Sequence, residues 1–171
     1  MYRALIAREG DGKFTRKIEE RNINELPPNN VLIKVQYSSL NYKDALSATG
    51  NKGVTRRYPF QPGIDASGIV EQSESPLINK GDEVLVTGYD LGMNTDGGFG
   101  EYIRVPGEWV VPKPSALTLR DCMVYGTAGF TAALGIDKML RMGQKPEDGR
   151  ILVTGASGGV GSLAVSILSR L

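Results

Sequence analysis

Apolar and polar residues alternate in short runs over the first two thirds of the chain. In residues 31–37, VLIKVQY, every second position is Val, Ile, Val or Tyr, which is typical of a strand with one buried face. Further strands, each bounded by Gly, Pro, Asn or Asp, are predicted at residues 2–7, 64–72, 83–87, 100–105 and 109–111. Many short strands in regular succession predict a β-barrel or a β-sandwich.

The period changes after residue 117. Thr118-Leu119-Arg120-Asp121 resembles a capping box, in which a hydroxyl and a carboxylate bond the first free N–H groups of a helix. Apolar residues then recur at helical spacing as far as Arg141, and Gly143 is expected to end the helix, with a proline beyond it. This stretch predicts one helix that follows the β-rich part.

The segment 151–161, ILVTGASGGVG, predicts a nucleotide-binding turn. Its first three residues form an apolar run, as expected of a strand buried on both faces of a parallel sheet. Glycines follow, and then the apolar helix pattern SLAVSIL, whose first N–H groups would point at an anion such as a pyrophosphate. Ala156 stands at the first glycine of the G-x-G-x-x-G pattern, and no Lys-Ser or Lys-Thr follows as in a Walker loop. An ordinary glycine-rich turn is the alternative.

Composition narrows the class of protein. The 171 residues are 40% hydrophobic, and 20 basic against 19 acidic residues leave a net charge of +1, so no binding to nucleic acid or to an anionic membrane is expected. No apolar run is long enough to span a membrane. A single cysteine, Cys122, fits a reducing cytoplasm. With no histidine and one cysteine, these residues cannot assemble a tetrahedral zinc site, and no metal is predicted.

The predicted fold class is therefore α+β, in two parts. Residues 1–115 are expected to form a β-rich domain, and residues 116–171 a helical bridge with the first strand and helix of an α/β domain. Since the chain ends soon after the glycine turn, the second domain is expected to be truncated. The residue that separates NAD from NADP binding, about 20 positions beyond the turn, would lie after Leu171.

Six segments, taken together and in order, resemble the medium-chain dehydrogenase/reductase superfamily, and more narrowly its zinc-free quinone-oxidoreductase-like branch, which includes acrylyl-CoA reductases. They are SSLNYKDALSATG at 38–50, PFQPGIDASGIV at 59–70, GDEVLVTGYDLG at 81–92, GGFGEYIRVPGEWVVPKP at 97–114, MVYGTAGFTAAL at 123–134 and ILVTGASGGVG at 151–161. Zinc-dependent relatives carry a metal-binding cysteine where this chain has Asn41, and Gly-His-Glu where it has Gly63-Ile64-Asp65. The resemblance thus agrees with the absence of metal ligands.

The resemblance implies a GroES-like β-barrel catalytic domain, a Rossmann nucleotide-binding domain, and a nicotinamide cofactor in the cleft between them. The implied cofactor is NADPH, and the implied substrate is a small-molecule enoyl-CoA, enone or quinone that receives a hydride. It further implies a cytoplasmic homodimer when the protein is intact. Negative charge that develops on the substrate oxygen would be stabilised by hydrogen-bond donors rather than by a metal ion.

Asn41 and Tyr42 are the predicted catalytic residues, because the resemblance places their segment along the nicotinamide cleft. A phenol stays protonated at neutral pH and donates a hydrogen bond, so Tyr42 would contact cofactor or substrate. Asn41 would donate through its amide. From the residues alone, Asn41 could equally cap a helix while Tyr42 packs on the barrel. Lys43 and Asp44 are expected to be a solvated pair.

The other predicted cofactor contacts lie further along the chain. The resemblance turns the Gly126–Thr131 segment toward the nicotinamide, with Thr127 as the contact, although small residues at this spacing also allow close helix packing. In the glycine turn, Ser157, Gly158, Gly159 and Val160 are predicted to bind the cofactor's phosphates.

Two other functions remain open at this stage. The turn also fits the T-G-x-x-x-G-x-G pattern of short-chain dehydrogenases, but in those enzymes it lies near the N-terminus, whereas about 150 residues precede it here. Alternatively, the chain is a non-catalytic β-barrel module, because one strand and one helix cannot enclose a dinucleotide.

Overall fold

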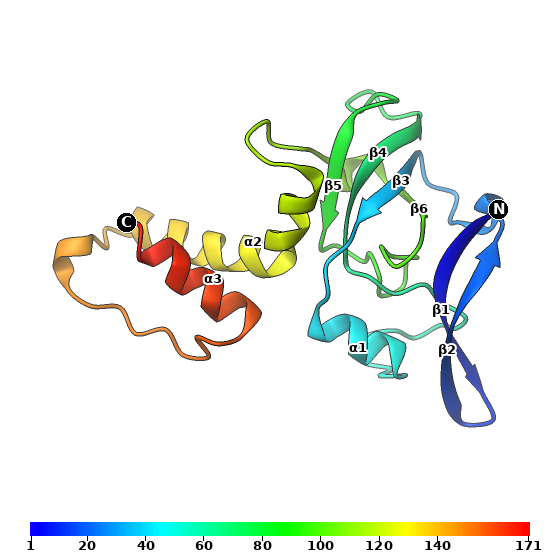
Figure 1. Cartoon of the computed structure of the whole chain (residues 1–171), viewed down its shortest axis with the longest axis horizontal. Helices are drawn as coiled ribbons and strands as arrows, with labels where there is room; N and C mark the ends of the chain where they lie inside the picture. The colour runs from blue at the N-terminus through cyan, green and yellow to red at the C-terminus, as the bar shows by residue number, and fades with distance from the viewer. The chain divides into compact units, whose positions relative to one another are not determined.

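The computed structural model describes residues 1–171, which form two compact units, Met1–Val124 and Tyr125–Leu171. The first unit contains a five-stranded antiparallel sheet with the strand order β6-β3-β4-β5-β7 (Figure 1). The strands of this sheet are β3 (Val31–Tyr37), β4 (Asp65–Ser73), β5 (Glu83–Thr87), β6 (Tyr102–Val105) and β7 (Val111–Pro112). The predictions for β3, β4 and β5 are confirmed to within one residue at each end.

Strand β3 is buried on both faces over its first half, which the alternating pattern does not predict. Val31 and Ile33 belong to the main core, as the alternation requires. Leu32 points the other way and is 4% exposed, because it packs in a second cluster with Tyr2, Ile6 and other side chains of the N-terminal strand. The main core combines inward side chains of the sheet with three from the connecting segments, Ile78, Leu91 and Val110; those from the sheet are Val31, Ile33, Ala66, Val70, Val84, Val86, Ile103 and Val105.

A two-stranded hairpin provides the second cluster. It pairs β1 (Tyr2–Gly10) with β2 (Lys13–Arg21) around Asp11 and Gly12, both of which have a positive φ. The sequence pattern misses β2 because no residue of KFTRKIEER is buried and six of the nine are exposed, so no hydrophobic alternation marks it. Its charges are typical of a solvated edge strand.

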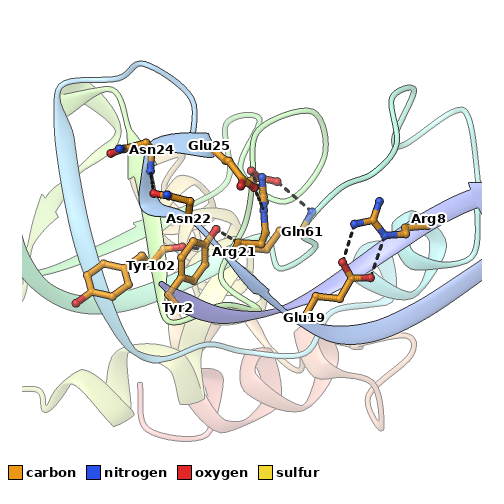
Figure 2. A network of polar contacts seen from close by, with 10 residues as sticks. Tyr2, Arg8, Glu19, Arg21, Asn22, Asn24, Glu25, Gln61 and Tyr102 are labelled. Atoms are coloured by element: carbon orange, nitrogen blue, oxygen red, sulfur yellow. Dashed lines mark hydrogen bonds and ion pairs between the residues drawn. The ribbon is translucent and has the colours of Figure 1, made fainter.

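A buried polar network fastens the hairpin to the rest of the first unit (Figure 2). The Tyr2 hydroxyl donates to Gln61 Oε1 at 3.0 Å, and the backbone N–H of Gln61 donates to Asp96 Oδ1 at 3.1 Å. Arg21, at the end of β2, forms an ion pair with Asp96 at 2.8 Å. The network therefore connects β1, β2 and two loops through one buried amide.

The predicted strand at 109–111 is wrong. Residues Gly107–Trp109 form a short 3-10 helix, and only Val111–Pro112 pairs with β5. Pro106 precedes this helical turn as its N-cap residue. Pro112 has no N–H, so it cannot donate a hydrogen bond that would extend the pairing with β5. Two further short elements of the first unit are the 3-10 helix Ile23–Glu25 and helix α1 (Tyr42–Ala48).

The predicted helix after residue 117 is confirmed as α2 (Leu119–Arg141). Its capping box is present, because the Thr118 N–H donates to Asp121 Oδ2 at 3.1 Å and the Asp121 N–H donates to Thr118 Oγ1 at 3.1 Å. The helix is interrupted at Gly126, whose φ of 47° and ψ of −154° lie outside the helical region. Such a positive φ is readily adopted only by glycine.

The second unit holds the rest of α2, a 3-10 helix at Pro146–Asp148 and helix α3 (Gly159–Leu168). The strand predicted at 151–153 is not formed, and Leu152 is 88% exposed. A strand of a parallel sheet needs neighbours to satisfy its backbone N–H and C=O groups, and no residue of this unit forms a strand. No helix in the structure combines the length and the apolar character needed to cross a membrane.

Candidate active site

The start of helix α1 is held by a carboxylate from its own first turn. Asn41 is the N-cap residue and forms a capping box with Asp44. Asp44 Oδ2 accepts the backbone N–H of Asn41 at 2.8 Å, while Asp44 Oδ1 accepts the backbone N–H of Ile64 at 2.9 Å. One buried side chain therefore joins the beginning of α1 to the residue just before β4.

The prediction that Asp44 forms a solvated pair with Lys43 is wrong for Asp44. Its side chain is buried, with 3% of the residue exposed. Burial raises the pKa of Asp44 above its ordinary value, the nearby Asp65 raises it further, and the two backbone N–H groups lower it by less than burial raises it. The sequence signal that was available is the capping-box spacing of Asn41 and Asp44.

A second carboxylate binds the side chain of Asn41. Asn41 Nδ2 lies 2.9 Å from Asp65 Oδ2 and 3.0 Å from Ser39 Oγ, and the Ser39 hydroxyl also donates to Asp65 Oδ2. Asp65 is the first residue of β4 and is fully buried. The sequence analysis named this residue only as a replacement for a glutamate, because a contact across 24 positions leaves no local pattern.

Asp65 itself is held by the packing of two loops. Its backbone oxygen accepts the Ser38 hydroxyl at 2.7 Å. Gly98 lies against the same oxygen so closely that a Cβ at this position would overlap it and would lie 2.7 Å from Ser38 Oγ. The Gly98 N–H donates to the Gly63 oxygen at 2.8 Å. This close packing of backbone on backbone fixes the position of the Asp65 main chain, from which the carboxylate extends.

Tyr42 lies beside this network but points out of it. Its side chain is 81% exposed, and the neighbouring Leu40 is 89% exposed. Two large, solvent-facing apolar side chains next to a buried polar network are typical of a surface that a ligand or another part of a protein covers. The first unit thus presents the phenol of Tyr42 at its surface, next to the held amide of Asn41, and the catalytic role of both residues stays a prediction.

The glycine turn and Thr127 belong to the second unit. Gly158 is the N-cap of α3, with no side-chain cap and no acidic residue in the first turn, so the first N–H groups of the helix are available to an anion. Gly161 lies so close to the Gly155 oxygen that no Cβ would fit. A Cβ at Gly159 would lie 3.5 Å from Ala128, next to Thr127, so the two predicted contact segments are neighbours within this unit. That Tyr42 and Thr127 face one ligand stays a prediction.

The ligand sets that bind metal ions are not assembled here. No group of three or more His, Cys, Asp or Glu side chains is placed to hold a metal. Cys122 is buried, and burial raises the pKa of its thiol. The polar groups of the site are an amide, a phenol, hydroxyls and two carboxylates, which suit hydrogen bonding and proton donation.

The fold and this site place the chain in a known class. A model of the alcohol dehydrogenase GroES-like domain matches residues 27–115, and the chain belongs to this family. The resemblance to the zinc-free, quinone-oxidoreductase-like branch is confirmed as well. The chain is 46% identical to the putative quinone oxidoreductase YhfP of Bacillus subtilis (strain 168), and the match covers 99% of the chain and 52% of that protein.

Two further relatives agree. The probable acrylyl-CoA reductase AcuI of Escherichia coli (strain K12) is 46% identical, over 98% of the chain and 52% of that protein. The crystal structure of the yhdH oxidoreductase from Salmonella enterica in complex with NADP has a TM-score of 0.96 and 46% identity, over 99% of this chain and 52% of that one. The chain therefore spans about half the length of the relatives it matches.

Proposed function

We propose that this chain supplies the GroES-like domain and the beginning of the Rossmann domain of an NADPH-dependent, zinc-independent reductase. The substrates would be activated C=C bonds, as in acrylyl-CoA or an enone, or quinones. Three observations support the proposal: the family membership, the names of the relatives, and a site built of hydrogen-bond donors. The same proposal includes a cytoplasmic homodimer, which rests on the family resemblance.

The second unit fits the phosphates of a dinucleotide. The start of α3 carries neither a side-chain cap nor an acidic residue, and the turn before it is closed by a glycine where no side chain fits. Backbone N–H groups near Ser157, Gly158, Gly159 and Val160 would bind the pyrophosphate, and Thr127 would contact the nicotinamide end. Solved relatives contain NADP, NADPH or NAD by their titles, and NADPH is our choice among them.

When bound, NADPH supplies the hydride that reduces the substrate. The residues of this chain would stabilise the negative charge that then develops on the substrate oxygen. Tyr42 would donate a hydrogen bond from its exposed phenol, and Asn41 would donate from its amide. A proton from Tyr42 or from water would complete the reduction. The observation that carries the proposal is that an exposed phenol and a firmly held amide stand on consecutive residues at the start of α1.

The test is Tyr42→Phe in the complete reductase, meaning the proposed full-length protein that contains this chain. We expect turnover of an enoyl-CoA or a quinone to fall by about 10²-fold, the usual cost of one lost donor to a developing oxyanion. Steady-state NADPH oxidation and the Kd for NADPH are the measurements. Tyr89→Phe, at another exposed tyrosine of the same unit, is the matched control.

Two outcomes count against the proposal. If Tyr42→Phe leaves both turnover and NADPH affinity unchanged, Tyr42 has no such role. The isolated 171-residue chain should not oxidise NADPH, because its second unit offers a helix and no paired strand to hold a dinucleotide. Turnover by that verified chain would refute this part of the proposal.

A further inference from the structure

The amide of Asn41 is more constrained than a surface N-cap requires. Its Nδ2 has two acceptors within 3.0 Å, Asp65 Oδ2 and Ser39 Oγ. These two acceptors are hydrogen-bonded to each other, so all three atoms form a small triangle. The two acceptors lie so close to each other that the angle they subtend at Nδ2 is less than half the angle between the two N–H bonds of a planar amide. A single hydrogen therefore serves both acceptors, and the second hydrogen points elsewhere.

The Asp65 carboxylate also decides which way the amide is turned. A carboxylate only accepts hydrogen bonds, so an Asn41 side chain rotated by half a turn would place its oxygen against Asp65 Oδ2. Two acceptors in contact repel, whereas an N–H to a carboxylate is among the stronger hydrogen bonds. Because Asp65 is fully buried, water does not screen this preference.

The support behind Asp65 is rigid. The residue opens β4, where it pairs with Thr87 of β5. Its backbone oxygen is bonded by Ser38 and packed by Gly98. The neighbouring Ile64 N–H is bonded to Asp44, which also holds the backbone of Asn41. Both the main chain and the side chain of Asn41 are thus fixed by buried carboxylates, the main chain by Asp44 of α1 and the side chain by Asp65 at the start of β4.

From this geometry we propose that Asp65 is a positioning residue. It engages one hydrogen of the Asn41 amide and thereby directs the other toward the ligand, so that Asn41 presents a donor and not an acceptor to a substrate oxygen. This inference rests on the proposed function, and it deepens that function by assigning Asp65 the task of selecting substrates that carry a hydrogen-bond-accepting oxygen.

The test exchanges the two side chains in the complete reductase. Asn41→Asp and Asp65→Asn are made singly, and then together. Each single variant removes the amide–carboxylate pair, and we expect both to lower the melting temperature and turnover. The double variant restores a pair with its direction reversed. We expect it to recover most of the melting temperature, while kcat remains lower than in the wild type by about 10²-fold or more.

The opposite result is equally clear. If the exchanged double variant recovers kcat together with stability, the pair is only structural and Asp65 does not position a donor. Asp96→Asn is the matched control, because it alters a carboxylate of the same unit that is bonded to Arg21 and not to the site. It should lower the melting temperature, but its kcat should equal that of the wild type at a temperature where both proteins are folded.

A second measurement does not depend on the variants folding well. In the wild-type protein, the side-chain hydrogen of Asn41 that faces the carboxylate should give an NMR signal downfield of the range seen for exposed asparagine amides. Addition of the oxidised cofactor with a substrate analogue should shift the signal of the other hydrogen. If both signals lie in the ordinary range, or if the ligand leaves the second signal unmoved, the assignment is overturned. If the wild-type enzyme reduces no enoyl-CoA, enone or quinone, the proposed function fails, while the melting and NMR results still decide whether Asp65 orients Asn41.

Discussion

The phenol of Tyr2 is predicted to make the stability of this domain fall in alkaline solution. Its side chain is 2% exposed, and its hydroxyl donates to Gln61 Oε1 at 3.0 Å (Figure 2). Burial, partly offset by the nearby Arg21, raises the pKa of Tyr2 to about 12 from an ordinary value of 10.0. The buried position cannot easily hold a phenolate, and the hydrogen bond to Gln61 needs the proton.

The size of the effect follows from linkage. At about 1.4 kcal/mol for each pKa unit, a shift from 10.0 to about 12 corresponds to about 3 kcal/mol. The sign is fixed because the native state holds this proton more tightly than the unfolded chain does. The contribution is therefore complete below the unfolded pKa, and it is lost as the pH rises from about 10 to about 12.

The perturbation is Tyr2→Phe. At neutral pH the variant loses one buried hydrogen bond and leaves the Gln61 oxygen without its donor, which costs about 1–2 kcal/mol. Above about pH 10 the wild type loses stability that the variant cannot lose. We therefore expect the two stability curves to converge and then to cross near pH 11 to 12, with Tyr2→Phe the more stable protein at the alkaline end.

Urea unfolding followed by far-ultraviolet circular dichroism, at several values between about pH 7 and about pH 12, measures this directly. Tyr42→Phe is the control, because Tyr42 is 81% exposed and its variant should follow the wild type throughout. Burial also raises the pKa of Tyr58, but that residue is present in all three proteins and cancels in the comparison. Parallel curves for wild type and Tyr2→Phe above pH 10 would refute the reasoning.

Two further variants test the support of the candidate site, with urea unfolding as the measurement. Asp44→Asn replaces a carboxylate that accepts two backbone N–H groups by an amide that can accept only one, so we expect a loss of about 1–3 kcal/mol. Since burial raises the pKa of Asp44, the native state binds the proton at a higher pH than the unfolded chain does, so Asp44 contributes more to the free energy of unfolding as the pH falls. The difference in unfolding free energy between wild type and variant should therefore widen from about pH 7 to about pH 4. A constant difference would contradict this. Gly98→Ala forces a Cβ against the Asp65 oxygen and should cost about 1–3 kcal/mol, whereas Gly10→Ala, with open space around it, should cost less than about 1 kcal/mol; equal losses would show that the close packing is not limiting.

Much of the fold could be predicted from the sequence wherever burial imposes a period. Strands β3, β4 and β5 and helix α2 each show one face of apolar residues, and a capping box marks where α2 begins. Strand β2 could not be predicted in this way, because none of its residues is buried and it is held by the ladder to β1 and by ion pairs. Periodicity reports burial, so a strand without a buried face leaves no such signal.

The segment 151–153 failed for a different reason. Its apolar run has the composition of a buried parallel strand, but a strand forms only where neighbours accept its backbone hydrogen bonds. The described residues offer no such neighbour, and Leu152 is exposed. The helix and glycine turn that follow need no sheet partner for their own hydrogen bonds, and the predicted helix is present as α3.

Only one part of the candidate site could be predicted from the sequence. Asn41 and Tyr42 stand in one short motif, whereas Asp65 reaches Asn41 only through the folded sheet. Elsewhere in the same unit, the half-buried Asp96 forms an ion pair with Arg21. Asp44 accepts hydrogen bonds from two backbone N–H groups, and Asp65 accepts them from a hydroxyl and an amide. Burying two neighbouring carboxylates costs desolvation free energy, and such a cost is typical of groups retained for function rather than for folding.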